Sequence, residues 1–277
     1  MLGGAELIEA ASDGQRGDKS RFVRGVERAL LEGDAEIGVH SAKDLPSTMS
    51  EGLSIAGVPA REEPRDAWVG ASASLDDVPE GARVGTSSLR RRSQLLARRP
   101  DLELVELRGN VDTRLRKLAD GDFDAIVLAA AGLRRLGREE DIAFLLGSDQ
   151  MTPAAGQGTL ALQTRTDDDP ARAAAGRISD PSALIELTAE RAAVASLDAS
   201  CATPIGIHAE HDGDAVVIDA FVGLPDGSEW VRDRVAGHPE NPVGTGQELA
   251  ERLMAAGAGE ILEEAQASEE RGARAKP

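Results

Sequence analysis

Four side chains capable of acid–base or hydrogen-bonding chemistry crowd into residues 40–46, namely His40, Ser41, Lys43 and Asp44. An apolar run over residues 35–39 precedes them and predicts a brief buried strand, and Pro46 ends regular structure. Lys and Asp are rarely buried unless paired. In α/β sheets, ligands bind at the carboxyl ends of strands, which is where this group falls. The stretch is therefore either a solvated loop or a site, and taken alone the solvated loop is the simpler interpretation.

Arginines form a second group with potential chemistry. Arg90, Arg91 and Arg92 fall in the first turn of a helix predicted from Leu89 to Arg99, directly after a Thr-Ser-Ser turn. Helix N-termini favour anions, so cations there are unfavourable unless an external anion bridges them. The hydroxyls of the turn and the free N–H groups of the helix start would form an anion cradle.

More arginines lie where strand ends are expected. Arg108 directly follows one predicted strand, Arg134 and Arg135 follow another, and Arg114 flanks the apolar stripe of a predicted helix. A single Arg is more often a surface charge. Several at equivalent ends of one sheet favour a cleft for a polyanion, because guanidinium forks bind carboxylates or phosphates in bidentate fashion.

Cys201 is the sole cysteine, and it stands among small, turn-forming residues. A buried inert thiol is the default interpretation, while a lone Cys in such a loop is also a candidate attachment point or nucleophile. Residue type alone leaves the two open. His208 and His211 fall at a strand end and would face opposite sides, so no metal site is expected.

Composition narrows the class of protein. The formal charge is −18, from 49 acidic and 31 basic residues, and only four of the basic residues are Lys. An acidic surface that keeps Arg and lacks Lys resembles the solubility device of a halophile and argues against nucleic acid as a partner. No run of about 18 apolar residues predicts a membrane span, and no signal peptide is evident. We expect a cytoplasmic monomer.

The elements that must position these residues form an α/β pattern. Residues 81–137 alternate strand, helix, strand, helix and strand, which predicts a parallel sheet with helical crossovers. An Ala-rich helix opens at Asp180 and Pro181. Two hairpin signals then surround a strand at 216–222, a last helix follows over about 246–256, and the charged tail after Ala267 is expected to fray.

These stretches together resemble the porphobilinogen deaminase family, also called hydroxymethylbilane synthases. No single match is specific, but all of them run in family order along most of the chain. The matching stretches are residues 40–46, 65–67, 84–91, 107–111, 113–115, 131–133, 135–137, 153–154, 156–158, 201 and 204–206.

The resemblance implies an α/β fold with two lobes of the type II periplasmic-binding kind and a small α+β C-terminal domain. The implied domains are residues 1–60 with 159–178, residues 61–158, and residues 179–277. It also implies an enzyme that condenses four porphobilinogens head to tail on a dipyrromethane cofactor, releases ammonia each time, and hydrolyses off a linear tetrapyrrole.

The same resemblance implies roles for individual residues. Asp44 is the expected catalytic carboxylate, and Cys201 is the expected thioether attachment of the cofactor. Cofactor binding is implied for Ser41, Lys43, Thr86, Ser88, Arg90, Arg91, Arg108 and Gly109, and substrate binding for Lys19, Arg114, Arg135 and Gln157. These cations suit porphobilinogen, which carries two carboxylates, and Asp44 suits the positive charge that develops as ammonia leaves.

The chain departs from the family pattern at its start. Family members begin with a strand, a helix and a second strand, and residue 1 falls where that second strand would have ended. Only Lys19 remains of two expected lysines, with Gln15 in place of the other. We therefore expect an incomplete first lobe and weak or no turnover, to be tested against a version extended upstream.

Two other classes of function compete with the enzyme. A non-enzymatic two-lobed binding protein for a small polyanion would use the arginines without needing Asp44 or Cys201. An inactive truncated deaminase is a variant of the enzyme interpretation. A nucleic-acid binder is a distant third, because aromatic residues are only 2% of the chain.

Overall fold

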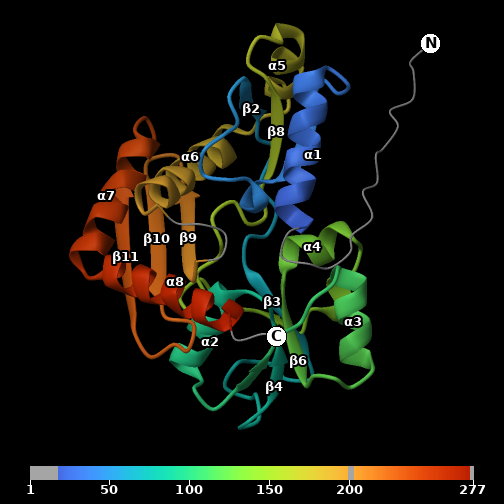
Figure 1. Ribbon diagram of the computed structural model, residues 1–277, viewed down its shortest axis with the longest axis vertical. Coiled ribbons are helices and arrows are strands. Elements are labelled where there is room, and N and C mark those ends of the chain that lie inside the picture. Colours follow the sequence, from blue (N-terminus) through green and yellow to red (C-terminus); the bar gives the residue numbers. More distant parts are fainter. Residues whose placement is uncertain (1–17, 199–202, 275–277) are drawn as a thin grey trace.

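Three sheets organise the computed structural model, which describes residues 18–198 and 203–274 (Figure 1). The first sheet has the antiparallel order β1-β8-β2, formed by β1 (Gly38–Ser41), β8 (Leu160–Arg165) and β2 (Leu53–Gly57). The helices α1 (Asp18–Glu32) and α5 (Asp169–Gly176) pack on it, and the short 3₁₀ helix η1 (Ala42–Asp44) follows β1. This sheet therefore joins segments more than a hundred residues apart and carries the 40–46 stretch at its edge.

The second sheet has the order β5-β4-β6-β3-β7. Its strands are β3 (Asp66–Gly70), β4 (Arg83–Gly85), β5 (Glu103–Val105), β6 (Ala125–Ala129) and β7 (Phe144–Leu145). The strand β4 pairs parallel with both β5 and β6, which confirms the predicted crossover pattern. The connecting helices are α2 (Leu89–Arg98), α3 (Val111–Ala119), α4 (Ala130–Arg135) and the 3₁₀ turn η2 (Glu139–Asp141).

Both faces of the second sheet are buried, as its continuous apolar strands require. Trp68 and Val127 pack into one hydrophobic cluster with Leu95 of α2. Their strand neighbours point the other way, into a second cluster with Leu115 of α3 and Leu133 of α4. Side chains that alternate along β3 and β6 thus anchor helices on opposite faces.

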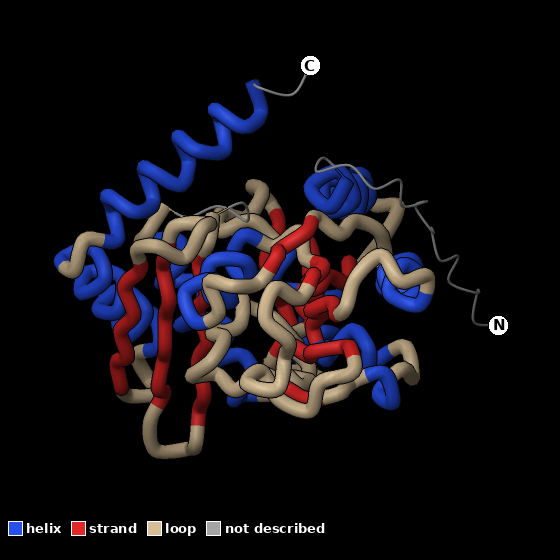
Figure 2. The backbone as a smooth tube through the Cα atoms, turned by 90° about the horizontal axis from the view of Figure 1, so that it is seen from below, coloured by secondary structure: helices blue, strands red, loops and turns tan. Residues whose placement is uncertain are grey.

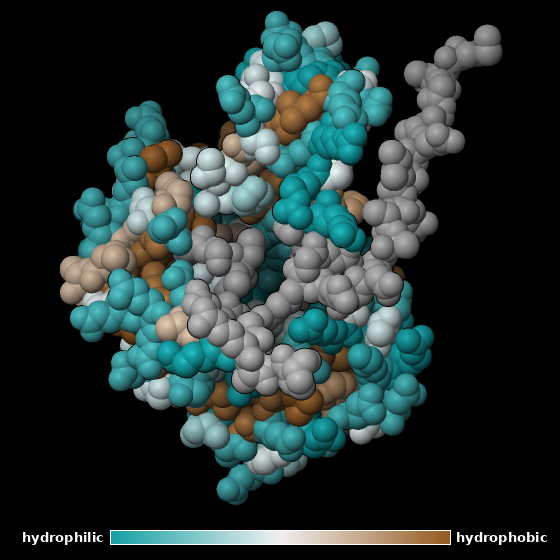
Figure 3. Space-filling model, viewed as in Figure 1, coloured by the Kyte–Doolittle hydropathy of each residue, from teal (hydrophilic) through white to brown (hydrophobic). Residues whose placement is uncertain are grey.

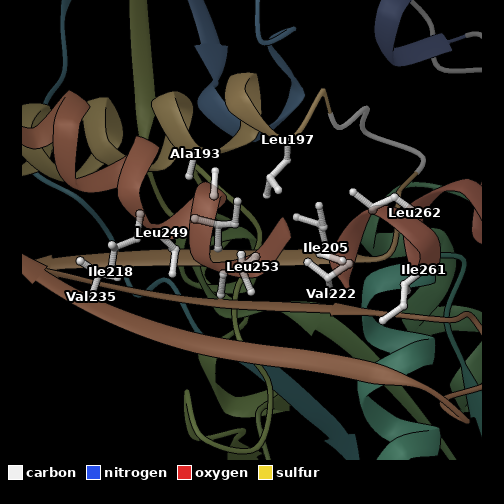
Figure 4. Close-up of a cluster of buried hydrophobic side chains, with 14 of the residues drawn as sticks. Ala193, Leu197, Ile205, Ile218, Val222, Val235, Leu249, Leu253, Ile261 and Leu262 are labelled. Carbon is white, nitrogen blue, oxygen red and sulfur yellow. The ribbon is translucent and has the colours of Figure 1, made fainter. Parts of the chain in front are cut away.

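The third sheet is an antiparallel meander of β9 (Ile205–His211), β10 (Val216–Gly223) and β11 (Trp230–Gly237). Both predicted hairpins are confirmed. The helices α6 (Pro181–Ser196), α7 (Pro242–Ala255) and α8 (Ala258–Arg274) cover it. Figure 4 shows their apolar side chains meeting those of the strands in one core. Asp180 caps α6 by accepting a hydrogen bond from the Ala183 N–H, as predicted.

The predicted end of the chain is wrong in one respect. Residues 258–274 form α8 instead of a fraying tail, and Gly257, with φ at +97°, makes the turn into it. Ile261, Leu262 and Ala265 are buried against the third sheet, while the acidic residues between them face solvent. In Figure 2 the helix that leads to the C-terminal end runs outward from the body of the molecule. Its high charge hid a narrow apolar stripe.

The strand before the 40–46 stretch also differs from the prediction. It occupies Gly38–Ser41 instead of 35–39, and within the described chain it pairs with β8 alone. Val39 points outward at 55% exposure, whereas His40 is buried at 2%. Side chains alternate between faces of a strand, so a run taken as wholly buried was in fact an edge strand with the histidine inside.

No helix in the part of the chain that the structure describes is long and apolar enough to span a bilayer. The face seen in Figure 3 is largely hydrophilic and is hollowed near its centre. The described candidate catalytic and binding residues come from the elements around the junction of the first and second sheets.

Candidate active site

Asp66, at the start of β3, is the buried centre of the arginine group. Its side chain is 0% exposed, and Arg90 and Arg91 beside it are 5% and 6% exposed. The Nη1 of Arg90 lies 2.7 Å from Asp66 Oδ2, and the Nη2 of Arg91 lies 2.7 Å from Oδ1. The expectation that only an external anion would offset these cations is therefore wrong, because a carboxylate of the chain itself lies between them.

The charge balance of this group remains positive. Burial raises the pKa of Asp66, but the charges of Arg90 and Arg91 outweigh it and hold the pKa well below its usual range. Burial lowers the pKa of Arg91 despite the carboxylate. Two guanidinium groups thus share a single ionised carboxylate, which leaves a net positive charge beside the start of α2.

Arg114 adds a third cation with a different environment. Its Nε donates to the Gly109 carbonyl at 2.8 Å, and no described carboxylate pairs with it. Its pKa is lowered to about 10, first by burial and then by the positive charge of Arg91. A half-buried cation without an anionic partner is costly, so an anionic ligand would relieve it.

Gln157 joins this group to the 40–46 stretch. Its side chain is 1% exposed, its Nε2 donates to Asp66 Oδ1 at 3.0 Å, and its Oε1 lies 3.4 Å from Arg90 Nη2. The same oxygen accepts from Lys43 Nζ at 3.4 Å. One amide therefore links η1 of the first sheet with the carboxylate and arginines of the second.

The backbone around η1 is fixed by close packing. Gly156 has φ at +72°, and a Cβ there would lie 2.8 Å from the Lys43 amide nitrogen and 2.9 Å from the Ala42 carbonyl carbon. Only glycine allows this approach. Ala42 and Leu45 are buried, while Ser41, Lys43 and Asp44 are half-buried, so apolar neighbours hold the loop and its polar side chains stay accessible.

Several sequence-predicted residues have local partners instead. Ser88 caps α2 by accepting from the Arg91 N–H, and Thr86 Oγ1 accepts from the Ser88 N–H at 3.2 Å. Arg108 pairs with Glu106 at 2.7 Å, and Arg135 Nη2 donates to the Gly158 carbonyl at 2.6 Å. These side chains are thus held by partners of the chain itself, Arg135 through the backbone directly after Gln157.

Two predicted residues are beyond what the structure describes. Cys201 lies outside the described residues. The backbone of Lys19 belongs to α1, and its side chain is not among those described. Of the histidines, His208 faces the buried Glu190, while His211 Nδ1 lies 3.0 Å from Ser182 Oγ. No set of described His, Cys, Asp or Glu side chains is grouped as a metal site.

Sequence reasoning missed Glu190 of α6 altogether. This side chain is 0% exposed and accepts from Arg61 Nη1 at 2.7 Å, the Gly156 N–H at 2.6 Å and the Ala209 N–H at 2.8 Å. It ties α6 to the segments that cross between the first and second sheets. A glutamate in the middle of an Ala-rich helix, beside a charged segment at 61–66, was the available signal.

Two α/β lobes meet at a polar, cationic seam, and an α+β unit lies beside them. The seam is formed by Lys43, Asp66, Arg90, Arg91, Arg114 and Gln157. This arrangement defines a two-lobed ligand-binding fold. Two family models match the chain: "Porphobilinogen deaminase, dipyromethane cofactor binding domain" over residues 8–173, and "Porphobilinogen deaminase, C-terminal domain" over residues 184–255. The chain belongs to the porphobilinogen deaminase family.

Curated relatives carry the same name. The porphobilinogen deaminase of Roseiflexus castenholzii is 48% identical over 247 residues, covering 89% of this chain and 81% of the relative. That of Campylobacter concisus is 45% identical over 253 residues, covering 90% and 82%. Among solved structures, the VFT2 domain of Bordetella pertussis BvgS covers 56% of this chain and 66% of its own, with 19% identity and a TM-score of 0.34.

The described side chains fit a polyanionic cofactor such as dipyrromethane, which the matched family domain binds. Arg114 lacks a carboxylate partner among the described residues, and Arg90 and Arg91 share one between them. Lys43 adds a further cation at the seam. Guanidinium and ammonium groups are the donors that carboxylates prefer.

Proposed function

We infer that this chain is a hydroxymethylbilane synthase, a transferase of tetrapyrrole biosynthesis that condenses four porphobilinogens on a dipyrromethane primer. The observation that carries the inference is the excess of cations over carboxylates in the buried seam. Arg90, Arg91 and Arg114 lie there with Asp66 as their described carboxylate. A growing chain of pyrroles, each with two carboxylates, is a ligand of matching charge.

We propose that Asp44 is the catalytic group. When bound, the cofactor supplies the pyrrole carbon that accepts the first substrate unit. The Asp44 carboxylate would accept hydrogen bonds from pyrrole N–H groups and stabilise positive charge on the substrate as ammonia leaves. It would also move a proton to the leaving amine. Its half-buried position suits both roles, because apolar packing of Ala42 and Leu45 holds the loop while the carboxylate stays accessible to a substrate.

We further propose roles for the other predicted residues. The geometry best supports Arg90, Arg91, Arg114, Lys43 and Gln157, which share direct contacts or charge coupling. The other predicted residues are proposed for the same binding roles, namely Lys19, Ser41, Thr86, Ser88, Arg108, Gly109 and Arg135.

Cys201 is the proposed attachment of the cofactor, because a thiolate can add to the electrophilic exocyclic methylene that forms on a pyrrole when its leaving group departs. The purified chain is expected to exceed its sequence mass by a pyrrolic adduct, and Cys201→Ser is expected to abolish that excess. Intact-mass spectrometry checks both. An adduct that survives in the Ser variant would place the attachment elsewhere.

Arg114→Gln is expected to weaken binding and yet stabilise the unliganded chain by about 1 kcal/mol, the size common for stabilising changes at functional sites. The reason is that folding half-buries this cation without a carboxylate partner, as its lowered pKa of about 10 reflects. Urea unfolding in a Cys201→Ser background, which cannot attach the cofactor, measures the effect. A matched change at exposed Arg116 should leave stability unchanged, and destabilisation by Arg114→Gln would contradict the assignment.

We also propose three domains with the boundaries given above, since each would contain one of the three sheets. A cytoplasmic monomer without nucleic-acid partners is proposed on the acidic charge and the scarcity of aromatic residues.

The charge of −18 supports a halophilic protein. Molar salt screens self-repulsion among acidic surface groups, so the unfolding temperature is expected to rise in molar KCl. Thermal unfolding followed by circular dichroism in dilute buffer and in molar KCl measures this. A chain that is better folded in dilute buffer would refute the halophilic assignment.

A further inference from the structure

The helix α6 belongs to the unit of the third sheet, yet one of its faces lies against the loop that carries Asp44. Ala183 and Leu187 are buried in a cluster with Ala42 and Leu45, the residues on either side of Lys43 and Asp44. Arg191 comes one turn after Leu187, so it shares this face. The helix thus meets the 40–46 stretch through two apolar contacts and one cation.

The Arg191 guanidinium binds the loop backbone directly after the stretch. Its Nη2 donates to the Pro46 carbonyl at 2.8 Å and to the Ser47 carbonyl at 2.9 Å, and lies 3.4 Å from Met49 Sδ. No described carboxylate pairs with it, and burial lowers its pKa. A half-buried cation that binds only neutral atoms contributes little to the stability of the fold. The two hydrogen bonds to adjacent carbonyls of one loop therefore indicate another role for Arg191.

The residue before it in the helix holds the other side of the same loop. Glu190 Oε2 accepts from the Gly156 N–H at 2.6 Å, and Gly156 packs on the backbone of Ala42 and Lys43. Adjacent side chains of α6 therefore fix the backbone on both sides of Asp44, one through Gly156 and the other directly at Pro46 and Ser47.

We propose that Arg191 is a positioning residue that sets the place of the Asp44 carboxylate by holding the backbone that follows it. This rests on the proposed catalytic role of Asp44. Reacting groups must be placed within a fraction of an ångström, and a misplacement of about 1 Å costs up to about 100-fold in rate. Both carbonyls accept from the same nitrogen, Nη2, which the rigid guanidinium plane holds in place, whereas the ammonium of Lys ends a flexible stem.

Removing the guanidinium should leave the fold intact. Arg191 borders an open groove of about 560 Å³, lined also by Ser47, Leu184, Thr188 and Val243. The Pro46 and Ser47 carbonyls can bind water there once the guanidinium is gone, so no buried acceptor is left unpaired. Loss of position is thereby separated from loss of structure.

The test uses the version of the chain extended upstream and compares Arg191→Ala and Arg191→Lys with Thr188→Ala, which alters the same groove and whose hydroxyl donates to the Leu184 carbonyl within α6. Arg191→Ala is expected to lower kcat for porphobilinogen roughly 10- to 100-fold with KM within about twofold, and to speed amide hydrogen exchange over residues 42–49. Arg191→Lys should recover part of both losses, and Thr188→Ala should resemble the wild type.

Hydrogen exchange is independent of turnover, which keeps the two claims apart. Unchanged exchange over residues 42–49 in Arg191→Ala would overturn the positioning role whatever the activity. Faster exchange with wild-type kcat would overturn it too, since the loop would move without effect on the reaction. If the version of the wild-type chain extended upstream released no ammonia from porphobilinogen, the proposed function itself would instead be contradicted.

Discussion

Asp44→Asn is expected to lower the turnover of porphobilinogen by about 100-fold or more while the chain stays folded and keeps its covalently bound cofactor. Asparagine preserves the shape of the side chain but carries no negative charge to stabilise the cation that forms as ammonia leaves. It also cannot take up or deliver the proton that the amine requires. Ammonia release and product formation under saturating substrate measure the effect.

The same variant separates an enzyme from a two-lobed binding protein. Affinity for the substrate is expected to change far less than turnover, because the arginines and Lys43 carry most of the charge recognition. Asp34→Asn, at an exposed position outside the site, is the matched control and should behave as the wild type. Full turnover in Asp44→Asn would remove Asp44 from the mechanism.

Asp66→Asn is expected to destabilise the fold by about 3–5 kcal/mol, the cost of breaking a buried ion pair from one side. Both guanidinium groups beside it are at most 6% exposed and would lose their shared carboxylate. Urea unfolding measures the change. Glu32→Gln, which removes an exposed partner of Arg28, is the control and should leave the midpoint unchanged.

The loss should depend on pH in a defined direction. The pKa of Asp66 is depressed in the folded chain, so its contribution is complete above the unfolded carboxyl pKa of about 4 and declines as pH falls toward the folded value. The difference between wild type and Asp66→Asn is therefore expected to shrink below about pH 4. A difference under about 1 kcal/mol at neutral pH would mean that the pair is not held as described.

Much of the fold follows from local patterns in the sequence. The caps of Ser88 and Asp180, the hairpins of the third sheet and the parallel crossovers of the second all depend on residues close together in the chain. Such signals act over a few residues and can therefore be predicted from the sequence. Which side chains of a short edge strand point inward cannot be predicted in this way, and the burial of His40 was therefore missed.

The site itself depends on long-range pairs that no local pattern encodes. Asp66 binds Arg90, 24 residues away, and Gln157, 91 residues away. The sequence indicated that cations at a helix start need an anion, but it did not identify Asp66 as that anion. The roles of Glu190 and Arg191 were likewise not predicted, because their partners, Gly156 and Pro46, lie in loops that are distant in the sequence and connect strands of the other two sheets.

The central claim is that a cationic seam holds a growing pyrrole chain beside Asp44, and intact-mass spectrometry during substrate addition tests it most directly. On incubation with porphobilinogen, the version of the wild-type chain extended upstream is expected to gain mass in steps of one substrate less one ammonia, and these steps should disappear as the linear product is released. If the mass of that version stayed equal to that of its sequence, before and after substrate, the account would be contradicted.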